Sequence, residues 1–298
     1  MATTTTSTST GYFTTAAQFR TIGSAISGAI QAVGLVQTSD TGQINWTTAS
    51  MPGSTYVISG YEIYRFSDSL QSTAPVFIKI EYGCAQLASY MGLWITVSTG
   101  TDGAGTPAGN ISWRFQCSNG NTDISTRTSY FSGSTNRLTF ALWPWPSTGS
   151  GQWHVFGVER THDSSGADTG TGVHILFSSA GSTGLGMSQY MPVGTTTAYL
   201  PAMVYNGWYC SAPLTGGGSF GGNVYTYPIR TFGMYENLPC FNFIHFAGTD
   251  ITVGSTVSVT NYDGNSRSYL APGMVNSTIG WFAYIGSSLT TGVAMRYE

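Results

Sequence analysis

Residues 60–83 read GYEIYRFSDSLQSTAPVFIKIEYG and predict two paired β-strands. From Glu62 to Phe66 successive side chains point to alternate faces, so that Ile63 shares no face with Tyr64, as in a half-buried strand. Pro75 then begins a second segment in which Val76, Ile78 and Ile80 point one way while Phe77, Lys79 and Glu81 point the other. A short polar turn joins the two segments. The stretch therefore predicts an antiparallel hairpin, onto which a preceding helix can pack.

The same texture continues to the end of the chain. After Asp40, short period-2 segments alternate with turns rich in Gly, Ser, Asn and Pro, and no βαβ alternation interrupts them. This pattern predicts a mainly β fold, an antiparallel β-sandwich that is jelly-roll-like, with an N-terminal arm and one amphipathic helix. The predicted strands are 44–48, 61–66, 76–82, 93–98, 111–117, 137–142, 153–160, 173–178, 198–204, 223–235, 241–246, 251–259, 279–285 and 293–297.

Three regions follow one another along the chain. Residues 1–13 are rich in Thr and Ser and predict a flexible N-terminal arm, which a neighbouring subunit would hold. Residues 14–36 predict an amphipathic helix with Phe19, Ile22, Ile26, Ile30 and Val33 on one stripe. Thr14 or Thr15 would cap its start and Gly34 would end it. Residues 40–298 form the β-sandwich region, and a subdivision near 185–222 is the alternative to one domain with a long loop.

Charge is scarce: only 8% of residues are charged, against roughly 25% in an ordinary soluble domain, and Lys79 is the single lysine. A surface of hydroxyl, amide and backbone groups costs little to desolvate when another subunit covers it, so the composition indicates an assembly component. With a net charge of −3 and no basic cluster, we expect no nucleic-acid binding. No apolar run is long enough to span a bilayer, and the N-terminus has no signal-peptide pattern, so we expect no membrane association.

The four cysteines, Cys84, Cys117, Cys210 and Cys240, are widely spaced and form no C-x-x-C pair. This spacing excludes a zinc knuckle or a redox motif. We expect them to be small buried hydrophobic residues, with disulfides as the alternative.

One segment gathers residues that could bind a ligand. Residues 153–177 contain His154, Glu159, His162, Asp163, Asp168 and His174. The spacing of the two aspartates does not match a calcium loop, so a polar hairpin tip over 162–172 is the interpretation and a metal site the alternative.

Two enzymatic patterns are weak. Gly217, Ser219 and Gly221 formally match G-x-S-x-G, but glycine loops flank them where a nucleophile elbow needs a strand and a helix. His245 and Asp250 follow in the wrong order for a triad. Paired carboxylates for sugar hydrolysis would have to come from the few acidic residues, among them Glu62, Glu81, Glu159, Glu236 and Glu298. We therefore assign no catalytic, cofactor-binding or metal-binding residue, expect no cofactor, and predict that the chain is not an enzyme.

Aromatic side chains form several short rows in the predicted strands. Alternation within strands places most of them in the core, and subunit contacts or sugar stacking are the alternatives. The rows are Trp143 and Trp145, Trp208 and Tyr209, Tyr225 and Tyr227, and Trp281, Phe282 and Tyr284.

Two blocks of the sequence form recognisable motifs. The first runs from QFRTIGSAISGAIQAVGLVQTSDTGQINW into GYEIYRFSDSLQSTAPVFIKIEYG, and the second is GVERTHDSSG. Both resemble stretches of a family of virion structural proteins of tailed bacteriophages. The resemblance covers about residues 17–180 and carries over no catalytic residue. It implies a subunit of the tail, neck, baseplate or tail fibre, made in the bacterial host cytoplasm and located in the virion.

The resemblance also implies partners. We expect a homo-oligomer, with a trimer favoured by analogy, and contact with other virion proteins through the N-terminal arm. A capsid-surface decoration protein and a receptor-recognition module that binds host surface glycan are the alternatives. A glycan-degrading enzyme is a third, weaker one.

Overall fold

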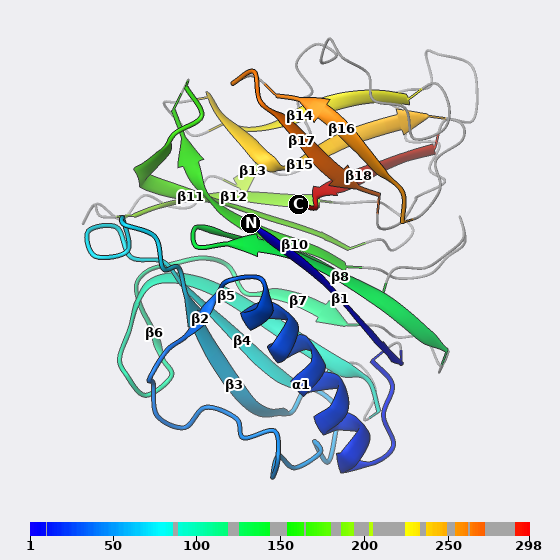
Figure 1. The fold of residues 1–298 in the computed structure, drawn as a ribbon. Helices are drawn as coiled ribbons and strands as arrows, with labels where there is room; N and C mark the ends of the chain where they lie inside the picture. The colour runs from blue at the N-terminus through cyan, green and yellow to red at the C-terminus, as the bar shows by residue number, and fades with distance from the viewer. Residues whose placement is uncertain are drawn as a thin grey trace.

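The computed structural model describes thirteen stretches of the chain, which contain one helix and strands β1 to β18 in three antiparallel sheets (Figure 1). The three sheets lie one above another, and the helix lies beside the lowest of them in the view of Figure 1. An antiparallel β-sandwich architecture with one helix is therefore confirmed. The described residues are 1–9, 11–85, 89–118, 125–143, 154–163, 165–179, 186–193, 203–204, 224–232, 237–248, 254–261, 263–271 and 290–298.

The first sheet contains the predicted hairpin. Its strand order is β2-β3-β4-β5-β6, and β7 also pairs with β5. In β4 burial alternates as predicted, with Ile78 and Ile80 inside and Lys79 and Glu81 partly exposed. The strands are β2 (Val36–Gln37), β3 (Ile58–Arg65), β4 (Phe77–Cys84), β5 (Met91–Thr101), β6 (Pro107–Ile111) and β7 (Phe115–Ser118).

Helix α1 (Ala16–Ala32) packs on the core side of this sheet and is confirmed with tighter bounds than predicted. Thr15 caps it, in a capping box with Gln18, and Gly34 follows its end with a φ of +106°. The whole predicted stripe from Phe19 to Val33 is buried. Gly23 lets the ring of Trp46 approach the helix, because a Cβ there would lie 2.0 Å from the ring.

A buried carboxylate ties the helix to the sheet. Glu62 accepts hydrogen bonds from Ser27 Oγ at 2.7 Å and from the hydroxyls of Tyr64 and Tyr82 at 2.8 and 2.7 Å. The indole nitrogen of Trp46 donates a fourth at 3.1 Å. These four donors satisfy the carboxylate, which would otherwise be costly to bury.

The central sheet lies above the first and has the strand order β1-β8-β9-β10-β11-β12-β13. Both of its faces are covered, so every residue of β9 and β10 is buried. Its strands are β1 (Ala2–Ser9), β8 (Thr126–Ser134), β9 (Arg137–Leu142), β10 (His154–His162), β11 (Asp168–Ser179), β12 (Gly186–Pro192) and β13 (Met203–Val204).

The prediction of a flexible arm over 1–13 is wrong for these residues. Residues Ala2–Ser9 form β1 and pair with β8 of the same chain, in unbroken register from Ala2↔Gly133 to Ser9↔Thr126. The physical reason is that β-branched threonine favours extended backbone, and β8 offers a complementary row of hydrogen-bonding groups. The arm is thus the edge strand of the central sheet.

The C-terminal sheet covers the other face of the central sheet. Its order is β14-β15-β18-β17-β16. One core cluster joins α1, the first sheet and the central sheet, and a second joins Val155 and Leu176 of the central sheet to Phe243, Leu270 and Met295. The strands are β14 (Val224–Phe232), β15 (Asn237–Gly248), β16 (Thr256–Thr260), β17 (Ser266–Leu270) and β18 (Thr290–Arg296).

Most predicted strands that fall on described residues are confirmed, with shifted ends. The exception is 44–48, which forms a turn because the Asn45 carbonyl accepts from the amides of Thr48 and Ala49 and its side chain accepts from Thr47. The predicted strands missed β1, β2, β8, β12 and β17. Residues 279–285, most of 198–204 and the proposed boundary at 185–222 lie largely outside the described residues.

Cys84 and Cys117 are buried thiols that form no disulfide, as expected of small hydrophobic residues. Cys210 and the side chain of Cys240 lie outside what the structure describes. Burial raises the pKa of both described thiols, so they stay protonated.

Candidate functional site

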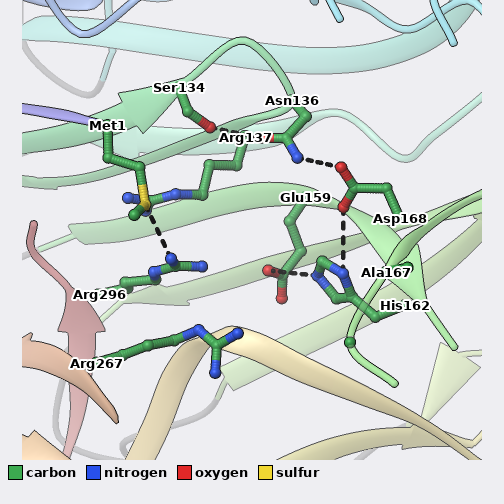
Figure 2. Close-up of a pocket in the computed structure, with 11 residues that line it drawn as sticks. Met1, Ser134, Asn136, Arg137, Glu159, His162, Ala167, Asp168, Arg267 and Arg296 are labelled. Carbon is green, nitrogen blue, oxygen red and sulfur yellow. Dashed lines mark hydrogen bonds and ion pairs between the residues drawn. The ribbon is translucent and has the colours of Figure 1, made fainter. Parts of the chain in front are cut away.

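A polar cavity of about 390 Å³ lies between the central and C-terminal sheets, and we call it the sheet cavity (Figure 2). Figure 2 shows three arginines on one side, His162 and Asp168 on the other, and Glu159 between them. The side chains come from β8 to β11 and from β17 and β18, with Met1 at one end. The lining residues are Met1, Ser134, Asn136, Arg137, Glu159, His162, Gly166, Ala167, Asp168, Arg267 and Arg296.

His162 is held between two carboxylates. Its Nε2 lies 3.2 Å from Oε2 of Glu159, and its Nδ1 lies 3.2 Å from Oδ1 of Asp168. Burial alone would lower the pKa of His162, but contacts with Asp168 and Glu159 outweigh it and raise the pKa to about 9. The imidazole is therefore a cation at neutral pH and cannot accept a proton as a general base.

A strand irregularity places His162 on this side of the sheet. In a regular strand successive side chains point to opposite faces, so Glu159 and His162, which are three residues apart, would lie on opposite faces. Arg160, next to Glu159, points to the first sheet, where it pairs with Asp68. The pairing of β10 with β11 shifts between Arg160 and His162. This bulge lets His162 reach Glu159, which a regular ladder would forbid.

Glu159 links the two sheets through backbone hydrogen bonds. Its side chain is 1% exposed, and its Oε1 accepts from the amides of Phe241 at 2.7 Å and Asn242 at 3.0 Å, both in β15. The other oxygen faces His162. A buried carboxylate with two amide donors and one cation is fully compensated, so it fixes the C-terminal sheet against β10.

The three arginines are each at least nine-tenths buried. Arg267 forms a two-pronged pair with Asp263, with contacts of 2.8 and 2.5 Å, and its guanidinium lies 4.1 Å from the ring centre of Phe241. Arg296 pairs with Glu298 at 2.6 Å. Arg137 donates to Ser132, Thr139 and the backbone oxygen of Glu298.

Burial and the neighbouring charges in the cavity both change the pKa of Arg137. Burial, together with the charge of Arg296, lowers the pKa of Arg137 to about 9, although Glu159 and Glu298 oppose the change. Next to the cavity, His174 of β11 lies directly opposite Glu159 of β10 in the strand pairing. Burial lowers the pKa of His174 to about 4, so it is neutral where His162 is charged.

The structure brings together only half of the six ligand-type residues noted in 153–177. Glu159, His162 and Asp168 meet in the cavity, and Asp168 also accepts from Asn136. Asp163 instead closes the hairpin turn by accepting from the amides of Ser165 and Ala167. The tip is thus shorter than 162–172, since β11 already begins at Asp168.

His154 is at the far end of β10, where its ring stacks on Phe177. Among the residues that the structure describes, no group of three or more His, Cys, Asp or Glu is arranged to hold a metal ion. The cavity lining contains three arginines and His162 against two carboxylates, those of Glu159 and Asp168.

The arginines of the cavity are the residues that sequence reasoning missed. Arg137, Arg267 and Arg296 are far apart in the chain, and only their position within strands of a charge-poor sequence could have drawn attention to them. Of the carboxylates considered for sugar hydrolysis, Glu62 lies in its own buried network and Glu81 pairs with Lys79 and Arg114. Glu236 and the G-x-S-x-G match at 217–221 lie outside the described residues, as does Asp250.

Of the aromatic rows, Trp143 is completely buried, as expected for the core. The side chains of the other row members are not among those described.

Comparison of the chain with protein-family models, with curated proteins and with solved structures gives no significant match. Within the described residues, no helix has the length and apolar character needed to cross a bilayer.

Proposed function

We propose that this chain is a structural subunit of a tailed-phage virion, in the tail, neck or baseplate, that acts by packing against other subunits. The observation that carries the proposal is that, among the described residues, six charged side chains of this charge-poor chain are buried inside the fold: Glu62, Arg137, Glu159, Arg160, Arg267 and Arg296. The exterior is correspondingly rich in hydroxyl, amide and backbone groups, which a neighbouring subunit can cover at little desolvation cost.

The inward use of charge is seen in the ion pairs. The side chain of Arg160 is 0% exposed and pairs with Asp68, and that of Arg267 is 9% exposed and pairs with Asp263. Glu62 and Glu159 are satisfied in the interior. A protein selected to stay apart from its neighbours would instead spread such charges over its surface.

The edge of the central sheet supports the proposal as well. Strand β1 is eight residues long, ends the sheet order, and contains neither a charged residue nor proline. Freely soluble proteins protect such edges with charge, proline or a bulge, because an open edge pairs with other strands. In a virion subunit, the outer edge of β1 would accept a strand from a neighbour.

The proposed location rests on the resemblance to virion proteins, and the trimer is proposed by analogy. Particles of the phage that encodes the chain should contain it at a fixed copy number, measured by quantitative mass spectrometry after density-gradient purification. Host cytoplasmic proteins in the same fractions are the control. Absence of the chain from intact particles would contradict the proposal.

Self-association is tested on the purified chain. Light scattering coupled to size-exclusion chromatography should show an oligomer, and Thr5→Lys in β1 should weaken it, because a lysine on an edge strand opposes strand pairing. Thr48→Lys, on an exposed turn, is the matched control and should leave the oligomer unchanged. A wild-type chain that stays monomeric over the whole concentration range would refute packing through its own copies.

A further inference from the structure

Two arginines that line the sheet cavity each have a buried nitrogen without an acceptor. The Nε atoms of Arg137 and Arg267 have almost no solvent-accessible area, and neither has a hydrogen-bond partner among the described residues. The two side chains are 3% and 8% exposed. A buried charged donor is almost always satisfied in a folded protein, so both guanidinium groups have donor capacity left for a ligand in the cavity.

The third arginine has one strong and one poor acceptor. Nη2 of Arg296 lies 2.6 Å from Oε1 of Glu298, and it also donates to Sδ of Met1 at 2.9 Å, a contact drawn in Figure 2. A thioether is a weak acceptor, and the Met1 side chain is 72% exposed, so little holds it in place. An oxyanion would be a better partner for this nitrogen and could displace the methionine.

The lining itself holds more cations than carboxylates. Four cationic side chains, those of Arg137, Arg267, Arg296 and protonated His162, face the cavity against the carboxylates of Glu159 and Asp168. Asp263 and Glu298, outside the lining, pair with Arg267 and Arg296 and balance this excess. An entering oxyanion would therefore share these two guanidinium groups with the carboxylates that already hold them.

We propose that the sheet cavity binds a small polar molecule through an oxyanion group, a carboxylate, phosphate or sulfate, held by the guanidinium groups of Arg137, Arg267 and Arg296. Guanidinium groups suit this role because their planar donors match oxyanion geometry. The volume of about 390 Å³ is that of a small-molecule site and exceeds what one oxyanion needs. Ser134, Asn136 and Asp168 on the remaining wall would contact hydroxyl groups of the same molecule.

This inference is independent of the proposed virion role, since the cavity lies inside one chain. It would make the ligand a bridge between the central and C-terminal sheets, to which the arginines belong. Ligand binding would then stabilise the folded chain by mass action.

The first experiment titrates the purified full chain with inorganic phosphate, sulfate or glucuronate at constant ionic strength. In ¹⁵N-detected NMR of the arginine Nε–H groups, the resonances of Arg137 and Arg267 should shift in a saturable manner. That of Arg114, which pairs with Glu81 on the outer face of the first sheet, should stay in place. Chloride and neutral glucose are the negative controls, and the three anions distinguish phosphate, sulfate and carboxylate as the recognised group.

The second experiment measures affinity by calorimetry. Arg267→Lys keeps the charge but removes the planar donors, so the affinity should fall about tenfold. Arg114→Lys should leave the affinity within about twofold of wild type. If Arg267→Lys does not fold, the NMR titration of the wild-type chain still decides.

Two results would overturn the proposal. One is that none of the three anions gives a saturable shift at Arg137 or Arg267. The other is that the Nε–H resonance of Arg114 moves as much as those of the cavity, which would show nonspecific charge screening.

Discussion

The two histidines on either side of Glu159 should give the protein a maximum of stability near pH 6.5. His162 has a pKa raised to about 9 and His174 has one lowered to about 4, while both titrate at about 6.5 in the unfolded chain. The folded chain thus holds the proton of His162 more tightly, and that of His174 less tightly, than the unfolded chain does.

The signs of the two effects are opposite. For His162, the folded pKa is raised, so its stabilisation is fully present below about pH 6.5 and is lost as the pH rises through 9. For His174, the folded pKa is lowered, so the unfolded state takes up the proton first and stability is lost as the pH falls from about 6.5 to 4. The difference between the folded and unfolded pKa of each histidine corresponds to about 3 kcal/mol of unfolding free energy.

The assay is urea denaturation followed by tryptophan fluorescence at a series of pH values. Wild-type protein should lose about 3 kcal/mol on each side of the maximum from these two groups. His162→Gln should flatten the alkaline limb and keep the acid limb, and His174→Gln should do the reverse. Buried Cys84 and Cys117 add to the alkaline loss, because their thiols ionise more readily in the unfolded chain, and the difference between wild type and His162→Gln removes that contribution.

The reasoning would be refuted if His162→Gln kept the full alkaline loss of the wild type. That result would mean that His162 is neutral between its two carboxylates. It would also remove one of the four positive charges from the cavity lining.

Two further predictions concern packing and are read from thermal and urea unfolding. Gly23→Ala should destabilise the chain by about 1–3 kcal/mol, because the new Cβ would lie 2.0 Å from the ring of Trp46. The control is Gly28→Ala, whose Cβ would have no atom within 4 Å, and it should be neutral or stabilising by up to about 1 kcal/mol. Equal effects of the two changes would contradict the helix position. Arg160→Met should lower the unfolding free energy by about 3–5 kcal/mol, because it leaves the carboxylate of Asp68 without its cation. Arg114→Met, at the half-exposed pair with Glu81, should lower it by less than about 1 kcal/mol. A small effect at Arg160 would contradict the buried pair.

Local patterns predicted the local structure well. The 3.6-residue spacing from Phe19 to Val33 predicted the helix, and the alternation in 76–82 predicted the buried face of β4. The prediction failed where the amino acids carry little hydrophobic contrast. Residues 2–9, all small or hydroxyl-bearing, have no apolar period, yet they form a full strand because β8 provides the hydrogen-bonding partners.

The site was predictable only in part, and for a related reason. The hairpin brings Glu159, His162 and Asp168 together within one short segment, and the sequence shows that cluster directly. It does not show that Glu159 and His162 share a face, because no residue type in this segment predicts the bulge that brings His162 to the same face as Glu159.

By itself, the sequence determined a charge-poor, antiparallel β protein with one capped amphipathic helix, because period, turn residues and composition act over short distances. Only the tertiary structure decided that three sheets would stack, that the N-terminal residues would become an edge strand, and that Arg137, Arg267 and Arg296 would surround one cavity. The physical reason is that these features depend on which strands meet across the sheets. That outcome is set by how all the buried faces pack together, and no single segment specifies it.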